Sequence, residues 1–458
     1  MTMPRLTRRA AIAGGLAAVP ALTGLGATAA RPRSTVKRFY RADDGANLQP
    51  AFQRAIDWAG QNDSDLVSDF GRIAGELWCP ERIGPTGPDG NGIPLVVRHG
   101  TSIDFGGATF RLRGPGGNRV RAQRGSGDAQ PWLGGWLYAS AAGGGIDRLE
   151  IANVAVDGMF VGDFVTNRDS NLTDKGFMLF DERVREVVMR NVELRNFGGE
   201  IYYVGGPGPV RQLLENCHFH GSPQCAWNPG GTGKLVAINL RAGRAYQCAE
   251  VIGGKGHVYR GGHFYAPGNG GSSFFGGPSP GFRSGYPYSY AWWDGQGAPP
   301  YIRFEGTEFS GGHALWLGSW IEGRVRLVDT SIYFNPGVGH LRDIDLDIDA
   351  VCDAGSGNAV VTFGGVPQPG ARMAKAPADA LLLPPSDIHL RIACSRTARA
   401  RAAARTWATG FRFNGGHYDR DSLDVLVKGE VNSAVQMFGD GARGFPQPRV
   451  RDGGIVPR

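Results

Sequence analysis

Three stretches that repeat one pattern decide the fold. Residues 191–195 read Asn-Val-Glu-Leu-Arg, residues 216–220 read Asn-Cys-His-Phe-His, and residues 239–243 read Asn-Leu-Arg-Ala-Gly. The pattern continues with Gly-Gly-His-Phe-Tyr at 261–265 and Gly-Thr-Glu-Phe-Ser at 306–310. Self-similarity at a fixed period is the signature of a repeat architecture, so the search for that period comes before any count of strands.

The same period extends along most of the chain. Each of ten predicted strands has an apolar residue at the equivalent position: Leu149, Val187, Leu213, Val236, Val258, Ile302, Val325, Ile344, Ile388 and Leu423. The steps between them are 38, 26, 23, 22, 44, 23, 19, 44 and 35 residues, so the central steps cluster near one coil length and two are about twice that. One coil cannot bury its apolar face alone, whereas stacked coils form a continuous core. We therefore predict an all-β solenoid, a right-handed parallel β-helix.

The first hundred residues lead into this repeat through a predicted helix. Asp43-Asp44-Gly45 precedes residues 47–59, in which Leu48, Phe52 and Ile56 recur at helical spacing after a possible N-cap at Asn47. A short strand ending in Pro80 and a Gly-Gly-Ala strand at 106–108 follow. This order resembles the opening of the pectate-lyase-like superfamily of parallel β-helices. The resemblance implies that the helix caps the first coil.

The better-known enzyme signatures of that superfamily are missing. The one Asp-Asp pair, Asp43-Asp44, lies in the predicted cap, and neither Gly-His-Gly nor Arg-x-Pro-x-x-Arg occurs. The resemblance therefore concerns architecture, and function has to be argued from the site.

The N-terminus has the pattern of an export signal. A basic segment ending in Arg8-Arg9 precedes an apolar, small-residue run from 10 to 30, with a possible cleavage site at Ala27-Thr28-Ala29. This order predicts a twin-arginine-type signal peptide over residues 1–29 and a periplasmic or secreted protein. A transmembrane anchor is the less favoured alternative, because Pro20 interrupts the run. We expect the cap and first coils over 30–110 and the β-helix with inserted loops over 111–458.

Composition narrows the classes of partner. Removal of three arginines with residues 1–29 lowers the formal charge from +7 to +4, a mild basic excess that suits an acidic substrate but does not argue for nucleic acid. No later segment is long and apolar enough to span a membrane. The six cysteines have no Cys-x-x-Cys spacing, so we expect no zinc site. The oligomeric state is left open.

Stacking of the repeat places outward side chains in columns, because side chains alternate between core and solvent along each strand. Leu194, Phe219, Phe264 and Phe309 should point inward. One outward column then contains Glu193, His218, Arg241, His263 and Glu308, and the next contains Asp157, Arg195, His220, Gly243, Tyr265 and Ser310. A polysaccharide lying along the helix axis would meet consecutive rungs. A solvated ladder of alternating charge is the alternative for this surface.

The residues that follow align as a third set. Glu200, Gln224 and Gln247 are expected to face outward, while Ile201, Cys225 and Cys248 face the core. Cys225 and Cys248 would then be neighbouring reduced thiols, because directly stacked parallel strands rarely allow disulfide geometry.

An aromatic segment at 286–294 (Tyr-Pro-Tyr-Ser-Tyr-Ala-Trp-Trp-Asp) interrupts the repeat. Tyr290, Trp292 and Trp293 offer flat faces on which sugar rings stack, so we predict a carbohydrate-contacting loop. An oligomer interface is the alternative for these residues.

Two kinds of cleavage could use these side chains. β-Elimination of a uronate polymer needs a base, an acid and positive charge. The predicted bases are His218, His220 or His263, the predicted acid is Tyr265, and the predicted cations are Arg241 with Arg195 or Lys255. No metal site is assigned, although a calcium ion held by Glu200, Glu250 or Asp157 could replace the arginines.

Hydrolysis needs two carboxyl groups on either side of the bond. Glu200 and Glu250 are two rungs apart, on the order of 10 Å. We expect Gln224 and Gln247 to bind substrate in either case. The first hypothesis is therefore a polysaccharide lyase, with a glycoside hydrolase as the alternative. A transferase, a uronate epimerase and a non-catalytic binding or assembly protein remain further readings of the same surface.

Overall fold

The structure is a computed structural model. It describes residues 31–80, 92–117, 135–140, 144–159, 175–179, 183–205, 209–230, 233–252, 256–266, 272–276, 301–312, 314–334, 343–355, 358–363, 388–414, 423–437 and 448–456. The expected signal peptide, Lys255 and the aromatic segment with Tyr290, Trp292 and Trp293 lie outside these ranges. The predictions for them remain predictions.

The described strands form two sheets, of which the larger runs the length of the molecule and the smaller covers only its first half. The smaller sheet contains β4 (Leu95–Val97), β6 (Leu137–Ala139), β8 (Phe177–Leu179), β10 (Tyr202–Val204) and β13 (Trp227–Asn228). The larger sheet begins with β1 (Arg33–Thr35), β2 (Asp65–Val67), β3 (Ala74–Trp78), β5 (Thr101–Arg113), β7 (Ile146–Asp157), β9 (Val184–Arg195), β11 (Arg211–Glu215), β12 (His218–Cys225), β14 (Lys234–Ile238) and β15 (Arg241–Ile252).

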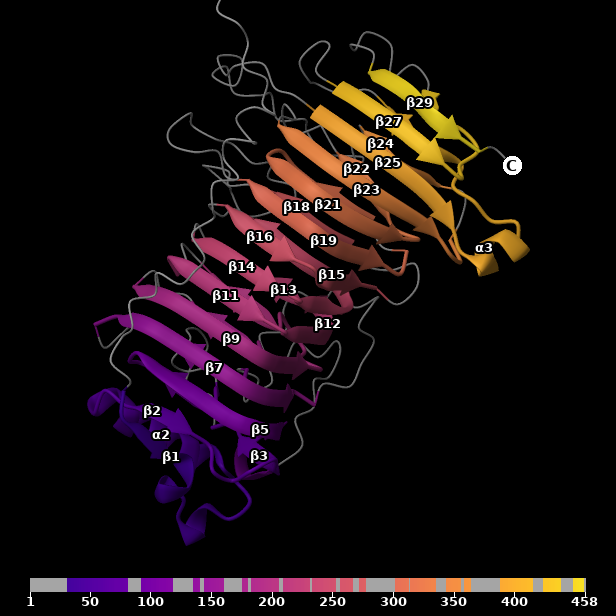
Figure 1. Ribbon diagram of the computed structural model, residues 1–458. Helices are drawn as coiled ribbons and strands as arrows, with labels where there is room; N and C mark the ends of the chain where they lie inside the picture. Colours follow the sequence, from indigo (N-terminus) through magenta and orange to yellow (C-terminus); the bar gives the residue numbers. More distant parts are fainter. Residues whose placement is uncertain are drawn as a thin grey trace, which may run out of the picture.

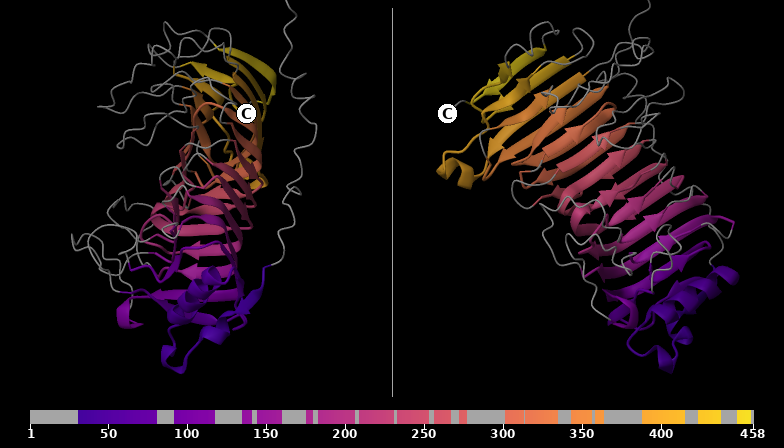
Figure 2. Two further views of the ribbon diagram at one scale, coloured as in Figure 1. Left: turned by 90° about the vertical axis from the view of Figure 1, so that its left-hand side faces the viewer. Right: turned by 180° about the vertical axis from the view of Figure 1, so that it is seen from behind.

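The second half of the larger sheet continues in the same way. Its strands are β16 (His257–Arg260), β17 (His263–Tyr265), β18 (Ser272–Gly276), β19 (Ile302–Ser310), β20 (Ala314–Leu317), β21 (Ile321–Val328), β22 (Ser331–Phe334), β23 (Ile344–Cys352), β24 (Ala359–Phe363), β25 (Ile388–Arg396), β26 (Thr409–Phe413), β27 (Leu423–Gly429), β28 (Val435–Met437) and β29 (Arg449–Ile455). Figures 1 and 2 show these strands stacked along one axis, from the cap at the indigo end to β29 at the yellow end. The chain is the right-handed parallel β-helix that the repeat predicts.

A helix covers the first coils. Helix α2 (Gln49–Gln61) buries Phe52, Ala55 and Ile56 against the core, and the Phe52 ring stacks on Phe105 with centroids 5.3 Å apart. Asn47 is not the N-cap that we predicted, because that position belongs to Leu48. The Asn47 side chain instead accepts hydrogen bonds from the backbone amides of Gln49 and Trp78, and these bonds connect the start of the helix to β3.

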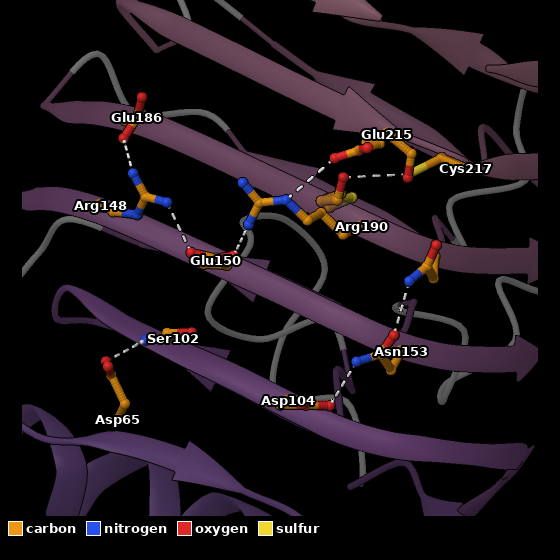
Figure 3. Close-up of polar contacts among 12 residues, drawn as sticks. Asp65, Ser102, Asp104, Arg148, Glu150, Asn153, Glu186, Arg190, Glu215 and Cys217 are labelled. Carbon is orange, nitrogen blue, oxygen red and sulfur yellow. Dashed lines mark hydrogen bonds and ion pairs between the residues drawn. The ribbon is translucent and has the colours of Figure 1, made fainter. Parts of the chain in front are cut away.

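Asparagines turn the chain at one corner of successive coils. Asn153, Asn191, Asn216 and Asn239 have φ angles between 52° and 57°, a left-handed conformation that asparagine tolerates better than most residues. Their amides form a ladder, in which Asn191 donates to Asn153 (2.9 Å), Asn216 to Asn191 (3.4 Å) and Asn239 to Asn216 (3.1 Å). Figure 3 shows the start of the ladder, where Asn153 donates to Asp104. At Asn216 and Asn239 the corner separates two strands, whereas at Asn153 and Asn191 it lies within β7 and β9.

The register beyond this corner agrees with the predicted columns. Leu194 pairs with Phe219, Phe219 with Ala242, and Phe264 with Phe309, and these side chains are fully buried. The third predicted set is wrong in part. A register shift between Ser222 and Cys225 pairs Cys225 with Gln247, so Cys225 and Cys248 are not equivalent positions. All six cysteines are buried free thiols.

The outer faces contain charge ladders. In Figure 3, Arg148 bonds Glu150 and Glu186, while Arg190 links Glu150 to Glu215 across three strands. Among the described residues, no helix is long and apolar enough to cross a membrane.

Candidate functional site

The predicted outward columns come together as one surface, which we call the histidine patch: Asp157, Glu193, Arg195, His218, His220, Arg241, His263 and Tyr265. In register, His218 pairs with Glu193 and Arg241, and Arg241 pairs with His263. The second column runs from Asp157 through Arg195 and His220 to Gly243 and Tyr265. The residues lie on β7, β9, β12, β15 and β17, five neighbouring strands of the larger sheet.

Each histidine of the patch has a hydrogen-bond partner. His218 Nε2 lies 2.8 Å from the Tyr265 hydroxyl, His220 Nε2 lies 2.9 Å from Glu193 Oε1, and His263 Nε2 lies 2.6 Å from Ser310 Oγ. Arg195 donates to Asp157 and Glu193, and the Arg241 guanidinium lies 5.9 Å from the Tyr265 ring centroid.

These surroundings set the charges of the patch. The hydrogen bond from His220 is the main reason that the pKa of Glu193 falls to about 2. Burial, with smaller effects of the His220 and Arg241 charges, lowers the pKa of His218 to about 4. Burial also lowers the pKa of His263 and raises that of Tyr265. At neutral pH, His218 is therefore neutral and Glu193 is a carboxylate.

A second group of polar residues lies on the next face around the coil, where β12 turns into β13. We call it the carboxyl cluster: Lys175, Glu200, Tyr203, Asn228 and Glu250. Tyr203 on β10 pairs with Asn228 on β13, and β13 packs beside β15, which contains Glu250. Lys175 forms an ion pair with Glu200, and Asn228 Nδ2 donates to Glu200 Oε1 at 2.9 Å. The Lys175 ammonium also lies 4.0 Å from the Tyr203 ring centroid.

Glu250 is the unusual member of this cluster. Burial first, and then the negative charge of Glu200, raise the pKa of Glu250 to about 7, although Lys175 opposes the shift. No hydrogen bond contributes to this shift. Burial and the charges of Glu200 and Glu250 also raise the pKa of Tyr203, which therefore keeps its proton at neutral pH. A carboxyl group that titrates near neutral pH can transfer protons when it lies next to a second carboxyl group, a lysine and a phenol.

Aromatic side chains extend the same face along the helix axis. Glu250 pairs with Phe274, Phe274 with Trp316, and Trp316 with Tyr333. The Trp316 and Tyr333 rings stack with centroids 4.9 Å apart, and both are partly exposed between buried neighbours. We call Phe274, Trp316 and Tyr333 the aromatic track.

The structure separates the residues that the sequence grouped. His218, His220, His263, Arg195, Arg241 and Tyr265 meet in the patch, whereas Glu200 and Glu250 belong to the carboxyl cluster. Glu200 is only 5% exposed, because Lys175 and Asn228 cover its carboxyl group, so it does not face solvent as predicted. Gln224 has a buried Oε1 without a partner among the described residues, and the register shift moves Gln247 opposite Cys225.

Sequence reasoning missed Lys175, Tyr203, Asn228 and the aromatic track. The sequence did contain a signal for Trp316 and Tyr333. Ala-Leu-Trp-Leu at 314–317 and Ser-Ile-Tyr-Phe at 331–334 each place one of these aromatic residues between two apolar residues. Of the calcium ligands considered earlier, Glu200 and Glu250 lie in the carboxyl cluster, whereas Asp157 bonds Arg195 in the histidine patch.

Comparison with known proteins supports the fold. No protein-family model matches the chain, and no curated protein matches it. Among solved structures, the chain is similar to the A-module of the mannuronan C-5 epimerase AlgE4 of Azotobacter vinelandii. The alignment has 12% sequence identity and a TM-score of 0.50, and it covers 93% of this chain and 99% of that module. A likeness at this identity establishes the shared β-helix architecture.

Proposed function

We propose that this protein is an exported enzyme that cleaves an acidic, uronate-containing polysaccharide by β-elimination, with Glu250 as the base. The observation behind this proposal is the position of Glu250, a carboxyl group with a pKa near 7 between Lys175, Glu200 and Tyr203. A base is most effective when its pKa lies near the working pH. The solved structure with the same architecture is named a mannuronan C-5 epimerase, and this supports an acidic polysaccharide as substrate.

The cluster has a group for each part of the reaction. The Glu250 carboxylate would remove the proton next to the uronate carboxyl group, and the Lys175 ammonium would offset the charge that develops on the enediolate. Tyr203, whose pKa is raised, holds a proton that it would give to the leaving oxygen. Trp316 and Tyr333 of the aromatic track, which are partly exposed, would support the adjoining sugar rings by stacking.

The cluster suits an acidic chain electrostatically. Lys175 and Glu200 balance each other as an ion pair, and Glu250 is uncharged in about half of the molecules when the pH equals its pKa. An incoming uronate therefore meets less repulsion than two ionised glutamates would cause.

The histidine patch is the other location at which a base was expected. There His218, His220 and His263 each already share a ring nitrogen with a neighbour, while no hydrogen bond contributes to the raised pKa of Glu250. Arg195 is likewise held between Asp157 and Glu193. We therefore place the proton transfer at Glu250.

Hydrolysis is the second candidate, and one observation favours it. Lys175 and Asn228 hold Glu200 while burial raises the pKa of Glu250, and a glycosidase requires a carboxyl group that can act as the acid together with a second carboxyl group. In that reaction Glu250 would act as the acid and Glu200 as the base or nucleophile.

The products separate the two candidates. Mature protein would be incubated with a panel of acidic polysaccharides, with and without calcium, while absorbance near 235 nm and new reducing ends are both measured. We expect the absorbance to rise, because β-elimination leaves an unsaturated uronate. New reducing ends without absorbance would establish hydrolysis instead. If neither signal appears on any acidic or neutral glycan, the proposal of a cleaving enzyme fails, and the epimerase and the non-catalytic binding protein take its place.

A further inference from the structure

Three side chains of the histidine patch lie close enough to share one ion. Glu193 on β9 is directly opposite His218 on β12, and His220 follows two residues later on the same face of that strand. Their potential ligand atoms, one from each residue, all lie within 4.8 Å of one another. Within the described part of the chain, this is the one group of three or more His, Cys, Asp or Glu side chains that is so close.

The spacing needs little adjustment for metal binding. Ligands about 2.1 Å from a tetrahedral ion lie roughly 3.4 Å from each other. His220 Nε2 and Glu193 Oε1 are 2.9 Å apart, and the His218 and His220 rings stack at a centroid distance of 4.0 Å with 20° between their planes. Small rotations of the side chains would therefore open the group around an ion without moving either strand.

We propose that Glu193, His218 and His220 form a binding site for a divalent first-row transition-metal ion such as Zn²⁺. Two imidazoles and one carboxylate suit zinc, cobalt, nickel and copper, whereas calcium and magnesium prefer oxygen ligands throughout. This set leaves at least one coordination position open to solvent or to an anionic ligand. The site is separate from the carboxyl cluster, so the inference does not depend on the proposed function.

Neighbouring residues support the three ligands. Arg195 donates to Glu193 Oε1 at 3.2 Å and to Asp157 Oδ2 at 3.0 Å, which fixes the orientation of the Glu193 carboxylate. The Tyr265 hydroxyl lies 2.8 Å from His218 Nε2 and so helps to fix the orientation of the His218 ring.

The positive charges of Arg195 and Arg241 disfavour a cation at this site, but each charge is weakened by its surroundings. The charge of Arg195 is offset by its ion pair with Asp157. Arg241 is exposed, so water and salt screen its charge. The ion would join β9 to β12 and so tie two consecutive coils together, which should stabilise the folded chain in proportion to the ion's affinity.

The test measures metal binding directly. Untagged mature protein, freed of metal with a chelator, would be titrated calorimetrically with ZnCl₂, and CoCl₂ would be added to record visible absorption from cobalt bound to nitrogen ligands. We expect one saturable site in the wild-type protein. His220→Ala and Glu193→Gln should each weaken binding at least about tenfold. The matched control is His263→Ala, which removes a histidine of the same patch outside the ligand set and should bind as wild type does.

Two results would overturn the proposal. One is the absence of saturable Zn²⁺ and Co²⁺ binding by the wild-type protein. The other is equal affinity in the His220→Ala, Glu193→Gln and His263→Ala variants. Circular dichroism of each variant shows whether it folds, and Glu193→Gln keeps the size of the side chain in case His220→Ala does not fold. Since neither metal-binding measurement depends on turnover, the test of the metal site is independent of the test of β-elimination.

Discussion

At the scale of single residues, burial decides which groups can exchange protons. Glu250 is half-buried and His257 is fully buried, and burial shifts their pKa values in opposite directions, to about 7 and about 4. A low dielectric disfavours the charged form of both groups. The directions differ because the charged form of a glutamate is deprotonated, whereas that of a histidine is protonated. Glu250 therefore titrates near neutral pH, whereas His257 remains neutral there.

His257 should make the protein sensitive to acid. It is 1% exposed on β16, and neither ring nitrogen has a partner among the described residues. Since its folded pKa lies below the unfolded value of about 6.5, its contribution to stability is present above pH 6.5 and is lost as the pH falls toward 4. His257→Leu should reduce the loss of unfolding free energy between pH 7.5 and 5 by about 2 kcal/mol.

Urea unfolding of both proteins at the two pH values measures this difference. The acidic groups that they share cancel in the comparison. An equal loss of stability in wild type and His257→Leu would show that the buried imidazole does not control the acid response.

At the scale of elements, the asparagine corners explain how each coil turns. Sequence comparison aligned Asn191, Asn216 and Asn239, and that alignment predicted the outward columns beyond the corner. It did not predict the ladder, because a repeated asparagine alone does not reveal a left-handed backbone conformation. The one-residue shift at Ser222–Cys225 was also invisible, since a bulge preserves composition while it changes which residues are opposite each other.

Asn216 should be more sensitive to alanine than to glycine. Its φ is 53°, and its side chain joins the amides of Asn191 and Asn239. Asn216→Ala loses these hydrogen bonds and adds a backbone penalty, for a total of about 1–3 kcal/mol. Asn216→Gly loses only the hydrogen bonds, so it should be the more stable variant. Denaturant unfolding of both variants gives the order, and an alanine variant as stable as the glycine variant would contradict the role of the corner.

At the scale of the whole molecule, stacking converts a weak repeat into continuous surfaces. The period of the sequence was sufficient for the β-helix, the buried phenylalanine stack and the histidine patch, because all of these depend only on register. The carboxyl cluster was not predictable in the same way. Lys175 and Tyr203 lie outside the repeated stretches, and only folding brings them to Glu200 and Glu250.

The aromatic track should contribute to binding along the axis rather than to the chemical step. Trp316→Ala and Tyr333→Ala are expected to raise KM roughly tenfold each, equivalent to about 1.4 kcal/mol of lost binding, with little change in kcat. Tyr40→Ala, a partly exposed aromatic residue in the N-terminal cap, is the control. The measurement is steady-state kinetics on a polysaccharide that the 235 nm assay identifies as a substrate. A fall in kcat with unchanged KM would place these rings at the reacting bond.

The central claim, that Glu250 is the base of an eliminase, is tested most directly by the pH dependence of kcat/KM at 235 nm. Wild-type activity should rise as the pH passes through about 7, because the carboxylate is the active form. Glu250→Gln should lose at least about 100-fold at every pH. Glu305→Gln, which alters an exposed carboxylate paired with Arg260, is the matched control and should keep the wild-type profile. Full activity of Glu250→Gln, or a wild-type profile that falls through pH 7, would contradict the assignment.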